Sequence, residues 1–370
     1  MITPAVGWAL GLPERVPEGT PIWQAGRPRV VRTTDGGGHW AIVLPNAAYP
    51  TVAVAADFHD GGHAWVLELL DGESTASNET VMVASTDDGG LHWTRTPRLY
   101  VNGQAARIQF LDATHGWVFA TPSAGGALGS QDTTLYRTID GGAHWQIIKP
   151  ASQVGGAPGV YSTLPEACQG GGPIGTPSFI DAQTGWIGAF CDRLFLYATH
   201  DGGLSWVTQS FPPFPGPAYA DPAHVLYGVD PAVFTSSRDG VIVVRRGFTT
   251  GANALQEAAL YTTHDAGVSW VAFRLPVPEL AADFIDSQYG WMITAGPGGA
   301  TEVRSLYATA DGGRFWHQVS GPQDYFGRDL SFVSRTIGFI AEPAVKDQPG
   351  QLLKTTNGGA TWLRIEFVVD

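Results

Sequence analysis

The chain has 370 residues, 44% of them hydrophobic, and its 34 acidic side chains against 21 basic ones give a formal net charge of −13. A surface this acidic argues against nucleic acid as a partner, because affinity for phosphates depends on many cationic contacts. It also argues against an anionic membrane surface. No apolar run approaches the length of a membrane span, so we expect no membrane insertion in this chain.

Taken in chain order, the pattern predicts short strands separated by Gly-rich turns. The first unit is shortened and is expected to hold a strand over 6–10, a long loop over 11–28, and strands over 29–33 and 40–44. Later units show four strands each, which in the third unit cover 107–111, 117–120, 134–138 and 145–148. Residues 252–259 give the one hint of a helix, and they run into a strand that ends at Thr263.

One motif, T-x-D-x-G-x-x-W, recurs seven times, and its clearest copy runs from Thr138 to Trp145. Successive copies lie 46 to 64 residues apart. Seven copies at such intervals indicate a repeat architecture. The acidic or amide position of the seven copies is occupied by Asp35, Asp88, Asp140, Asp201, Asp265, Asp311 and Asn357.

Each motif position has a physical role. The Thr ends a strand, and the Asp carboxylate is expected to accept hydrogen bonds from amides of the turn that follows. Gly142 and its equivalents are expected to take a positive φ, and the Trp supplies an apolar ring for packing between units. Asn357 keeps the acceptor oxygen, and we expect Ala266 to fall at a position with no special requirement.

A second motif, F-x-[D/S]-x-x-x-[G/A]-W, precedes most copies of the first, as in Phe110 to Trp117. Together the two motifs contain 12 of the 13 tryptophans, Trp23 being the exception. We therefore interpret the tryptophans as packing residues rather than as ligand-stacking residues.

These patterns predict an all-β fold, a seven-bladed β-propeller with four antiparallel strands (A to D) in each blade. The chain is expected to form a single propeller domain over 1–370. Its blades are expected to cover approximately residues 1–45, 52–96, 105–149, 175–209, 230–274, 280–319 and 328–370.

The two faces of the predicted ring differ. The short A–B turns and the C–D turns with the Asp motif share one face, here called the turn face. The other, the loop face, is expected to carry the long connections, where binding sites usually lie. These connections are 11–28, 69–80, 121–133, 149–176, 208–230, 247–258 and 296–304.

Closure of the ring is not settled by the sequence. The last strand is expected over 363–367, which leaves no long segment to serve as strand A of the first blade, although residues 1–4 could form a stub. Met1 already falls inside the first repeat, so we expect no leader within the chain as given. We expect an exported protein whose leader or anchor was removed.

The motif copies resemble the Asp-box, or BNR, repeat of sialidases, sortilins and some glycosidases. The combined pattern, F-x-D-x-x-x-G-W followed by L-Y-x-T-x-D-G-G-x-x-W, looks most like bacterial propellers related to the photosystem II assembly/stability factor. The resemblance spans nearly the whole chain and implies the propeller fold. It does not imply an activity, because propellers host many.

The dispersed motif residues predict neither catalysis nor metal binding. One acidic side chain for each blade, spread around a ring, cannot converge on one substrate or ion, so we interpret the Asp positions as structural. Six of the ten histidines lie beside these turns and are equally dispersed. No H-E-x-x-H motif or paired Cys spacing occurs, and we expect no metal and no cofactor.

The only two cysteines, Cys168 and Cys191, fall at the loop face of the fourth blade. We expect them to form a disulfide, with two free thiols as the alternative. A disulfide would indicate an oxidising compartment and an extracytoplasmic location, whether secreted, periplasmic or on the cell surface.

A sialidase-like glycoside hydrolase is the enzymatic alternative. That family uses an arginine triad, a Tyr–Glu pair and an acidic residue, with an F/Y-R-I-P signature. Here Arg27-Pro28-Arg29 is the nearest match and lacks the aromatic residue and the Ile, so no catalytic residue is assigned. Polar candidates on the loop face are Arg107, Arg245, Arg246, Arg304, Arg328, Tyr161, Tyr219, Tyr325, Glu166 and Glu257.

The leading hypothesis is a non-catalytic, monomeric binding or assembly scaffold with a protein or glycan partner. Arg245 and Arg246 are the main binding candidates, because a cationic pair in an acidic protein suits an acidic partner. The alternative is that they pair with nearby carboxylates. Tyr161, Tyr219 and Tyr325 are further binding candidates, and Trp23 could join the first two in a carbohydrate platform.

Overall fold

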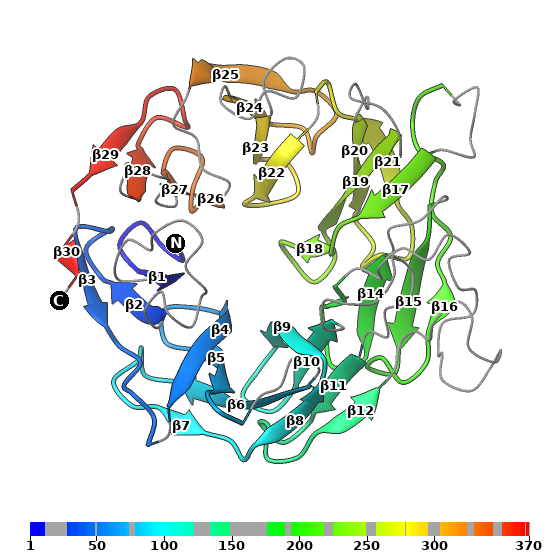
Figure 1. Ribbon diagram of the computed structural model, residues 1–370. Helices are drawn as coiled ribbons and strands as arrows, with labels where there is room; N and C mark the ends of the chain where they lie inside the picture. Colours follow the sequence, from blue (N-terminus) through cyan, green and yellow to red (C-terminus); the bar gives the residue numbers. More distant parts are fainter. Residues whose placement is uncertain are drawn as a thin grey trace.

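The computed structural model arranges seven β-sheets around a central axis, as Figure 1 shows. It describes residues 1–11, 28–48, 50–73, 78–121, 134–148, 176–188, 194–217, 225–248, 257–277, 279–294, 304–323, 329–342, 350–366 and 368–369. Every strand within these ranges belongs to one of the seven sheets, and no helix occurs in them. The predicted seven-bladed β-propeller is therefore confirmed.

The first three blades follow one another around the ring. Blade 1 contains β1 (Gly7–Gly11), β2 (Arg29–Thr33), β3 (His39–Ile42) and β30 (Val368–Val369). Blade 2 contains β4 (Thr51–Phe58), β5 (Ala64–Leu70), β6 (Asn78–Thr86), β7 (Thr94–Arg95) and β8 (Leu99–Asn102). Blade 3 contains β9 (Gln104–Phe110), β10 (Gly116–Thr121), β11 (Thr134–Thr138) and β12 (Gln146–Ile148).

The remaining blades complete the ring. Blade 4 contains β13 (Ser178–Phe179), β14 (Thr184–Gly188), β15 (Leu196–His200) and β16 (Val207–Thr208). Blade 5 contains β17 (Val225–Val229), β18 (Val233–Phe234), β19 (Gly240–Phe248), β20 (Glu257–Thr263) and β21 (Val271–Arg274). Blade 6 contains β22 (Glu279–Phe284), β23 (Gly290–Thr294), β24 (Arg304–Thr309) and β25 (His317–Gln323), and blade 7 contains β26 (Asp329–Phe332), β27 (Gly338–Glu342), β28 (Gln351–Thr355) and β29 (Leu363–Ile365).

Two blades depart from the expected four strands. In blade 2, β8 adds to β6 beside β7, within a segment that the sequence presented as a connection. In blade 5 the inner strand is divided into β17 and β18, both paired with β19. Strand β17 lies inside the expected loop 208–230, and residues 257–259 of the suggested helix belong to β20. Residues 225–229 were not predicted as a strand because their alternation of apolar and polar residues is too short to indicate one.

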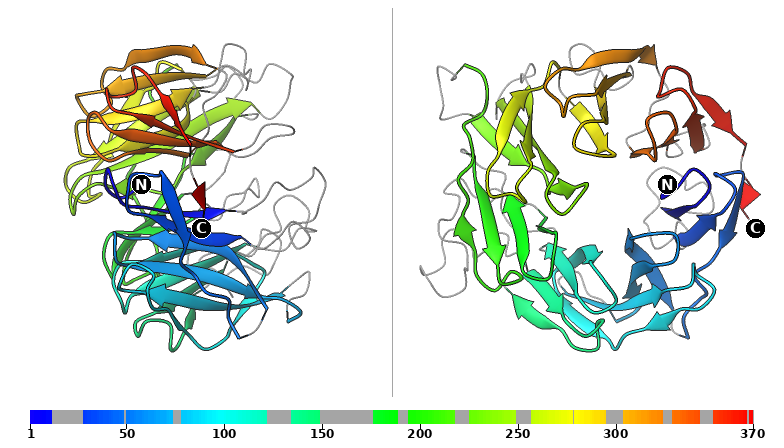
Figure 2. Two further views of the ribbon diagram at one scale, coloured as in Figure 1. Left: turned by 90° about the vertical axis from the view of Figure 1, so that its left-hand side faces the viewer. Right: turned by 180° about the vertical axis from the view of Figure 1, so that it is seen from behind.

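The ring closes at the outer edge of blade 1, not at its centre. Strand β30 pairs with β3 in parallel, His39 opposite Val368 and Trp40 opposite Val369. The final outer strand of blade 7 is shorter than expected and ends at Ile365, which frees the following residues to cross to blade 1. Residues 1–4 lie on the inner side of this seam, where the Ser331 hydroxyl of blade 7 donates to the Met1 carbonyl (3.2 Å). Figures 1 and 2 show the N-terminus toward the centre and the C-terminus at the rim.

The Asp motif builds the same turn in each blade. In blade 3 the Asp140 carboxylate accepts hydrogen bonds from the Thr138 hydroxyl and the His144 amide (both 2.9 Å), and the Thr138 hydroxyl accepts one from the Gly142 amide (2.8 Å). Gly142 has φ of 90°, as predicted. The expectation for Ala266 is wrong, because it takes φ of 60° where the other six copies have a glycine at positive φ.

A backbone hydrogen bond then joins this turn to the A–B turn of the same blade. The Gly141 amide donates to the Thr114 carbonyl (2.9 Å). Equivalent bonds occur in the other six blades, including the one from the Ala266 amide to the Arg238 carbonyl. The approach is so close that a Cβ on Gly141 would lie 2.7 Å from the Ala113 carbonyl oxygen. The turn face is thus fixed by backbone contacts that leave little space for side chains.

The hydrophobic core lies between blades and consists of clusters that each draw on two consecutive blades. A repeated aromatic stack forms the centre of most of them. Trp117 of blade 3 stacks on Phe179 of blade 4 (centroids 3.9 Å, planes 7° apart), and Phe179 contacts Trp206 of its own motif. The same arrangement joins Trp65 to Phe110 and Trp291 to Phe332. Among the described residues no helix could span a membrane.

We expect Trp117→Ala to lower the free energy of unfolding by about 3–5 kcal/mol, because it removes a buried indole and leaves a cavity beside Phe179. Urea unfolding followed by far-UV circular dichroism measures this change. Ile147→Ala, which truncates a side chain that is 59% exposed on β12, is the matched control and should change stability by less than about 0.5 kcal/mol. Equal losses in the two variants would contradict the interblade stack.

We expect Ala266→Gly to stabilise the protein by up to about 1 kcal/mol, because only glycine adopts a positive φ without steric cost. The reciprocal change, Gly141→Ala, should destabilise it, since the added Cβ meets the Ala113 carbonyl. Differential scanning calorimetry of both variants tests the pair. A lower melting temperature for Ala266→Gly would show that this turn is not strained.

We expect the loss of folding stability at low pH to depend on protonation of the motif carboxylates. Hydrogen bonding, first from the His144 amide and then from its imidazole, lowers the pKa of Asp140 to about 2. A lowered pKa stabilises the fold above the ordinary carboxyl pKa of about 4, and this contribution is lost as the pH falls toward 2. The difference in urea midpoint between wild type and Asp140→Asn should therefore be largest above pH 4 and vanish near pH 2.

The matched control for this titration is Asp329→Asn, which neutralises an exposed carboxylate on β26 outside the motif. Its midpoint is measured over the same range, pH 5 to pH 2, to correct for the loss of one surface carboxylate. A difference for Asp140→Asn that persists unchanged at pH 2 would contradict the assignment.

Candidate functional site

The two adjacent arginines on β19 lie on opposite sides of blade 5. Alternation along the strand places Arg246 with Val244 and Ile242, which pack against blade 4, and Arg245 with Val243 and Val241, which pack against blade 6. Both lie toward the loop-face end of the strand. The cationic pair predicted from the sequence is therefore divided between two environments.

Arg246 is a buried residue within an ion-pair network. Its side chain is 3% exposed, and its Nε and one terminal nitrogen donate to Glu257 Oε2 at 3.0 and 2.5 Å. That same nitrogen donates to the Pro217 carbonyl (3.2 Å), and the guanidinium lies 4.2 Å from the centre of the Phe214 ring. Glu257 also pairs with Arg274 of β21. A guanidinium can be buried here because its donors find acceptors and its flat face finds an aromatic ring.

Arg245 and Arg274 are the more accessible members of this cluster. Arg245 pairs with Asp230 at 2.5 Å, and both side chains are 37% exposed. Arg274 is 51% exposed. The alternative stated for the sequence, that Arg245 and Arg246 pair with nearby carboxylates, is what the structure shows. We call these five residues, Asp230, Arg245, Arg246, Glu257 and Arg274, the blade 5 charge cluster.

Blade 2 contains a second buried ion pair that the sequence did not indicate. Glu68 on β5 is 3% exposed and accepts from Arg95 Nε (2.7 Å) and from the Thr51 hydroxyl (3.1 Å). Arg95 also donates to the Pro45 carbonyl (2.7 Å). Glu68 does not stand out in sequence, because it belongs to a strand whose alternation looks like that of its neighbours, whereas Glu257 was among the loop-face candidates. Blades 2 and 5 thus each contain a buried Arg–Glu ion pair.

Two buried aspartates were also missed by the sequence reasoning. Asp57 and Asp283 each precede the Phe of the second motif, and burial raises the pKa of both carboxyl groups. Each accepts a backbone hydrogen bond from the next blade: Asp57 from Phe110 (2.7 Å) and Asp283 from Phe332 (2.5 Å). Gln109 does the same with Phe179, as both donor and acceptor. A raised carboxyl pKa is typical of catalytic acids, but these contacts give both residues a role in joining blades.

The remaining candidates are not brought together by the described structure. Arg107 lies on β9 of blade 3 and Arg304 on β24 of blade 6, away from the blade 5 charge cluster. Tyr161, Tyr219, Tyr325, Trp23, Glu166, Arg328 and both cysteines, Cys168 and Cys191, fall outside the described residues. In the described part of the chain no group of three or more His, Cys, Asp or Glu residues could hold a metal ion.

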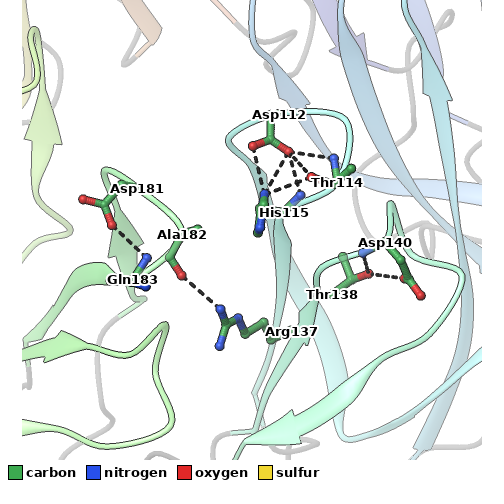
Figure 3. A network of polar contacts seen from close by, with 9 residues as sticks. All are labelled: Asp112, Thr114, His115, Arg137, Thr138, Asp140, Asp181, Ala182 and Gln183. Carbon is green, nitrogen blue, oxygen red and sulfur yellow. Dashed lines mark hydrogen bonds and ion pairs between the residues drawn. The ribbon is translucent and has the colours of Figure 1, made fainter.

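Polar groups of the turn face are engaged in local contacts. Figure 3 shows this at the junction of blades 3 and 4, where Arg137 donates to the Ala182 carbonyl (3.1 Å). Arg137 also donates to the Asp201 carbonyl (2.9 Å). The nearby Asp112 carboxylate binds Thr114 and His115 of its own turn. Motif aspartates elsewhere bind His39, His92, Ser205 and Ser269 in the same way. These carboxylates therefore stabilise turns one by one around the ring.

Comparison with known proteins supports the fold. No protein-family model matches the chain, and no curated protein matches it. Among solved structures, YCF48 bound to a D1 peptide shares 17% identity over 96% of this chain and 91% of its own, with a TM-score of 0.52. YCF48 from Cyanidioschyzon merolae shares 15% identity over 86% of each chain, with a TM-score of 0.50.

An enzyme of the same fold is equally similar. The GH74 xyloglucanase from Xanthomonas campestris shares 15% identity over 92% of this chain, with a TM-score of 0.54, and this chain spans 52% of its length. The resemblance drawn from the motifs is thus confirmed in the solved structures. The chain shares its propeller fold with YCF48 and with a xyloglucanase.

Proposed function

We propose that the protein is a non-catalytic binding scaffold in an extracytoplasmic compartment and that its loop face binds an acidic segment of a protein partner. The observation that supports this most directly is the blade 5 charge cluster, in which the Arg246–Glu257–Arg274 group and the Arg245–Asp230 pair lie on the two sides of blade 5, in a protein of net charge −13. A local excess of positive charge attracts an acidic partner.

The burial of Arg246 assigns different roles within the cluster. Arg246, held by Glu257 and Phe214, fixes the end of β19 and orients Glu257. Arg245 and Arg274, which are 37% and 51% exposed, are the groups that a partner can reach. A peptide-bound structure of a protein with this fold, YCF48 with a D1 peptide, makes a polypeptide ligand a reasonable choice for the first experiments. A glycan partner is the second class to test.

The test uses fluorescence anisotropy with a labelled decapeptide rich in Asp and Glu, and a peptide of the same length in which these residues are Asn and Gln. The acidic peptide should bind more tightly, and Arg245→Ala or Arg274→Ala should each weaken its binding about two- to fivefold, as expected for exposed charge pairs. The matched control is Arg364→Ala, an arginine 47% exposed on β29 of blade 7, which should leave the dissociation constant unchanged.

Two results would contradict this proposal. Equal binding of the acidic and neutral peptides would remove the blade 5 charge cluster as the site. Turnover of fluorogenic glycosides, including sialosides, that a single carboxylate substitution abolishes would favour the glycosidase alternative. Glu257→Gln is the first such substitution to examine, because its carboxylate lies between two arginines.

A further inference from the structure

The junction between blades 5 and 6 lacks two side chains that fill the turn face elsewhere. The second residue of strand B is a tryptophan in blades 1, 2, 3, 4 and 6 and Phe339 in blade 7, but Val241 in blade 5. The strand C residue before the motif Thr is Arg32, Arg137 or Lys354 in blades 1, 3 and 7, and a short residue in the other four: Ser85, Ala198, Thr262 and Ala308. Blade 5 is therefore the only blade with neither the aromatic ring nor the cation. Both substitutions shorten the side chain at the same junction.

At the junction of blades 3 and 4 these two positions cover a group of backbone carbonyls. Arg137 donates to Asp201 O and Ala182 O, and Trp117 Nε1 donates to Gly202 O (3.1 Å). In Figure 3 the Arg137 guanidinium extends across the junction toward Ala182. The repeat assigns the equivalent carbonyls in blade 6 to Asp311, Ser287 and Gly312. Val241 and Thr262 have no N–H group in their side chains with which to reach them.

A cavity of about 300 Å³ occurs at this place, lined by His264, Ser287, Gln288, Ala310, Asp311 and Arg314. We call it the junction pocket. The lining comes from the motif turn of blade 5, the A–B turn of blade 6 and the motif turn of blade 6. The pocket therefore coincides with the position that the missing arginine and tryptophan would occupy.

The motif turn of blade 6 also leaves a carboxylate oxygen without its usual side-chain partner. In blades 1 to 5 the residue four positions after the Asp, a His or a Ser, contacts its Oδ2 (2.6–2.7 Å). In blade 6 this residue is Phe315, which is 79% exposed and has no polar atom. Asp311 Oδ1 accepts from the Thr309 hydroxyl and the Phe315 amide. The Arg314 amide and the Arg314 charge also lie close enough to lower the pKa of the Asp311 carboxyl group. The junction pocket thus gains an anionic acceptor beside its carbonyls.

We propose that the junction pocket binds a guanidinium group, supplied as an arginine side chain by a partner polypeptide. Arg137 is the internal template, because a planar guanidinium with several donors fits a pair of carbonyls held at fixed positions. Arg314 at the rim lies toward blade 5, with its guanidinium 5.8 Å from the centre of the Phe273 ring. His264 uses Nδ1 to contact Asp239 (2.8 Å). This site lies on the turn face, opposite the blade 5 charge cluster on the loop face. Each proposal can therefore be tested independently of the other.

The probe is the blocked tripeptide acetyl-Gly-Arg-Gly-amide. The citrulline tripeptide is its neutral isostere, and the lysine tripeptide is a control that keeps the positive charge but lacks the planar set of N–H donors. Saturation-transfer NMR and calorimetric titration should show the arginine tripeptide binding at least fivefold more tightly than either. Thr262→Arg, which supplies the guanidinium from the chain itself, should abolish this binding and raise the melting temperature.

A second variant keeps the test decisive if Thr262→Arg does not fold. Asp311→Asn preserves the turn, as Asn357 does in blade 7 through Oδ1, and should weaken the arginine tripeptide at least fivefold. Asp140→Asn, the same change in blade 3, is the matched control and should have no effect. Equal binding of the citrulline tripeptide, or undiminished binding by Asp311→Asn, would overturn the proposal. Binding of acetate that Arg314→Leu removes, without binding of the arginine tripeptide, would instead identify an anion site and overturn it as well.

Discussion

The stack of a strand B aromatic ring on the phenylalanine of the following blade is the contact on which the ring depends. Each blade is a small sheet that cannot bury its own faces, so stability comes from what lies between blades. Trp117 on Phe179 and Trp291 on Phe332 show the rings nearly parallel. The motif tryptophan of the second blade contacts the same phenylalanine at a steep angle, 59° for Trp206 and 78° for Trp362. The polar contacts from Asp57, Gln109 and Asp283 run alongside these stacks and set the height of one blade against the next.

The fold could be predicted because its determinants are local and repeated. The hydrogen bonds of Asp140 and the positive φ of Gly142 follow from chemistry within eight residues. Ala266 was misjudged because an alanine does not by itself indicate a positive φ. The requirement for a positive φ at this position is visible only in the glycines of the other six motif copies. The pairing of β30 with β3 could not be foreseen, since it joins residues more than 300 positions apart through only two residues. Burial of Arg246 depends on Phe214 and Pro217, which sequence alone does not bring near β19.

The two faces use charge differently. On the turn face, carboxylates and imidazoles are paired within single turns, so the same contact is repeated from blade to blade. The Arg246–Glu257 pair lies inside blade 5 and the Arg95–Glu68 pair inside blade 2. Of the other blades, blade 7 alone has an Arg and a Glu, Arg364 and Glu342, at the positions equivalent to Arg95 and Glu68. A ligand that must recognise one blade among seven needs such departures from the repeat. The blade 5 charge cluster and the junction pocket both arise where blade 5 differs from its neighbours.

The repeated aromatic and carboxylate contacts between blades run in one direction around the ring. Trp117 reaches forward to Phe179 and Gly202, and Asp283 reaches forward to Phe332. The blades therefore associate head to tail, as subunits do in a heterologous assembly, and only closure at the seam between blades 7 and 1 makes the series finite. If β30 detached from β3, blade 7 of one molecule and blade 1 of another would present complementary surfaces. The pairing of β30 with β3 is thus the contact that turns a head-to-tail series of blades into a closed ring.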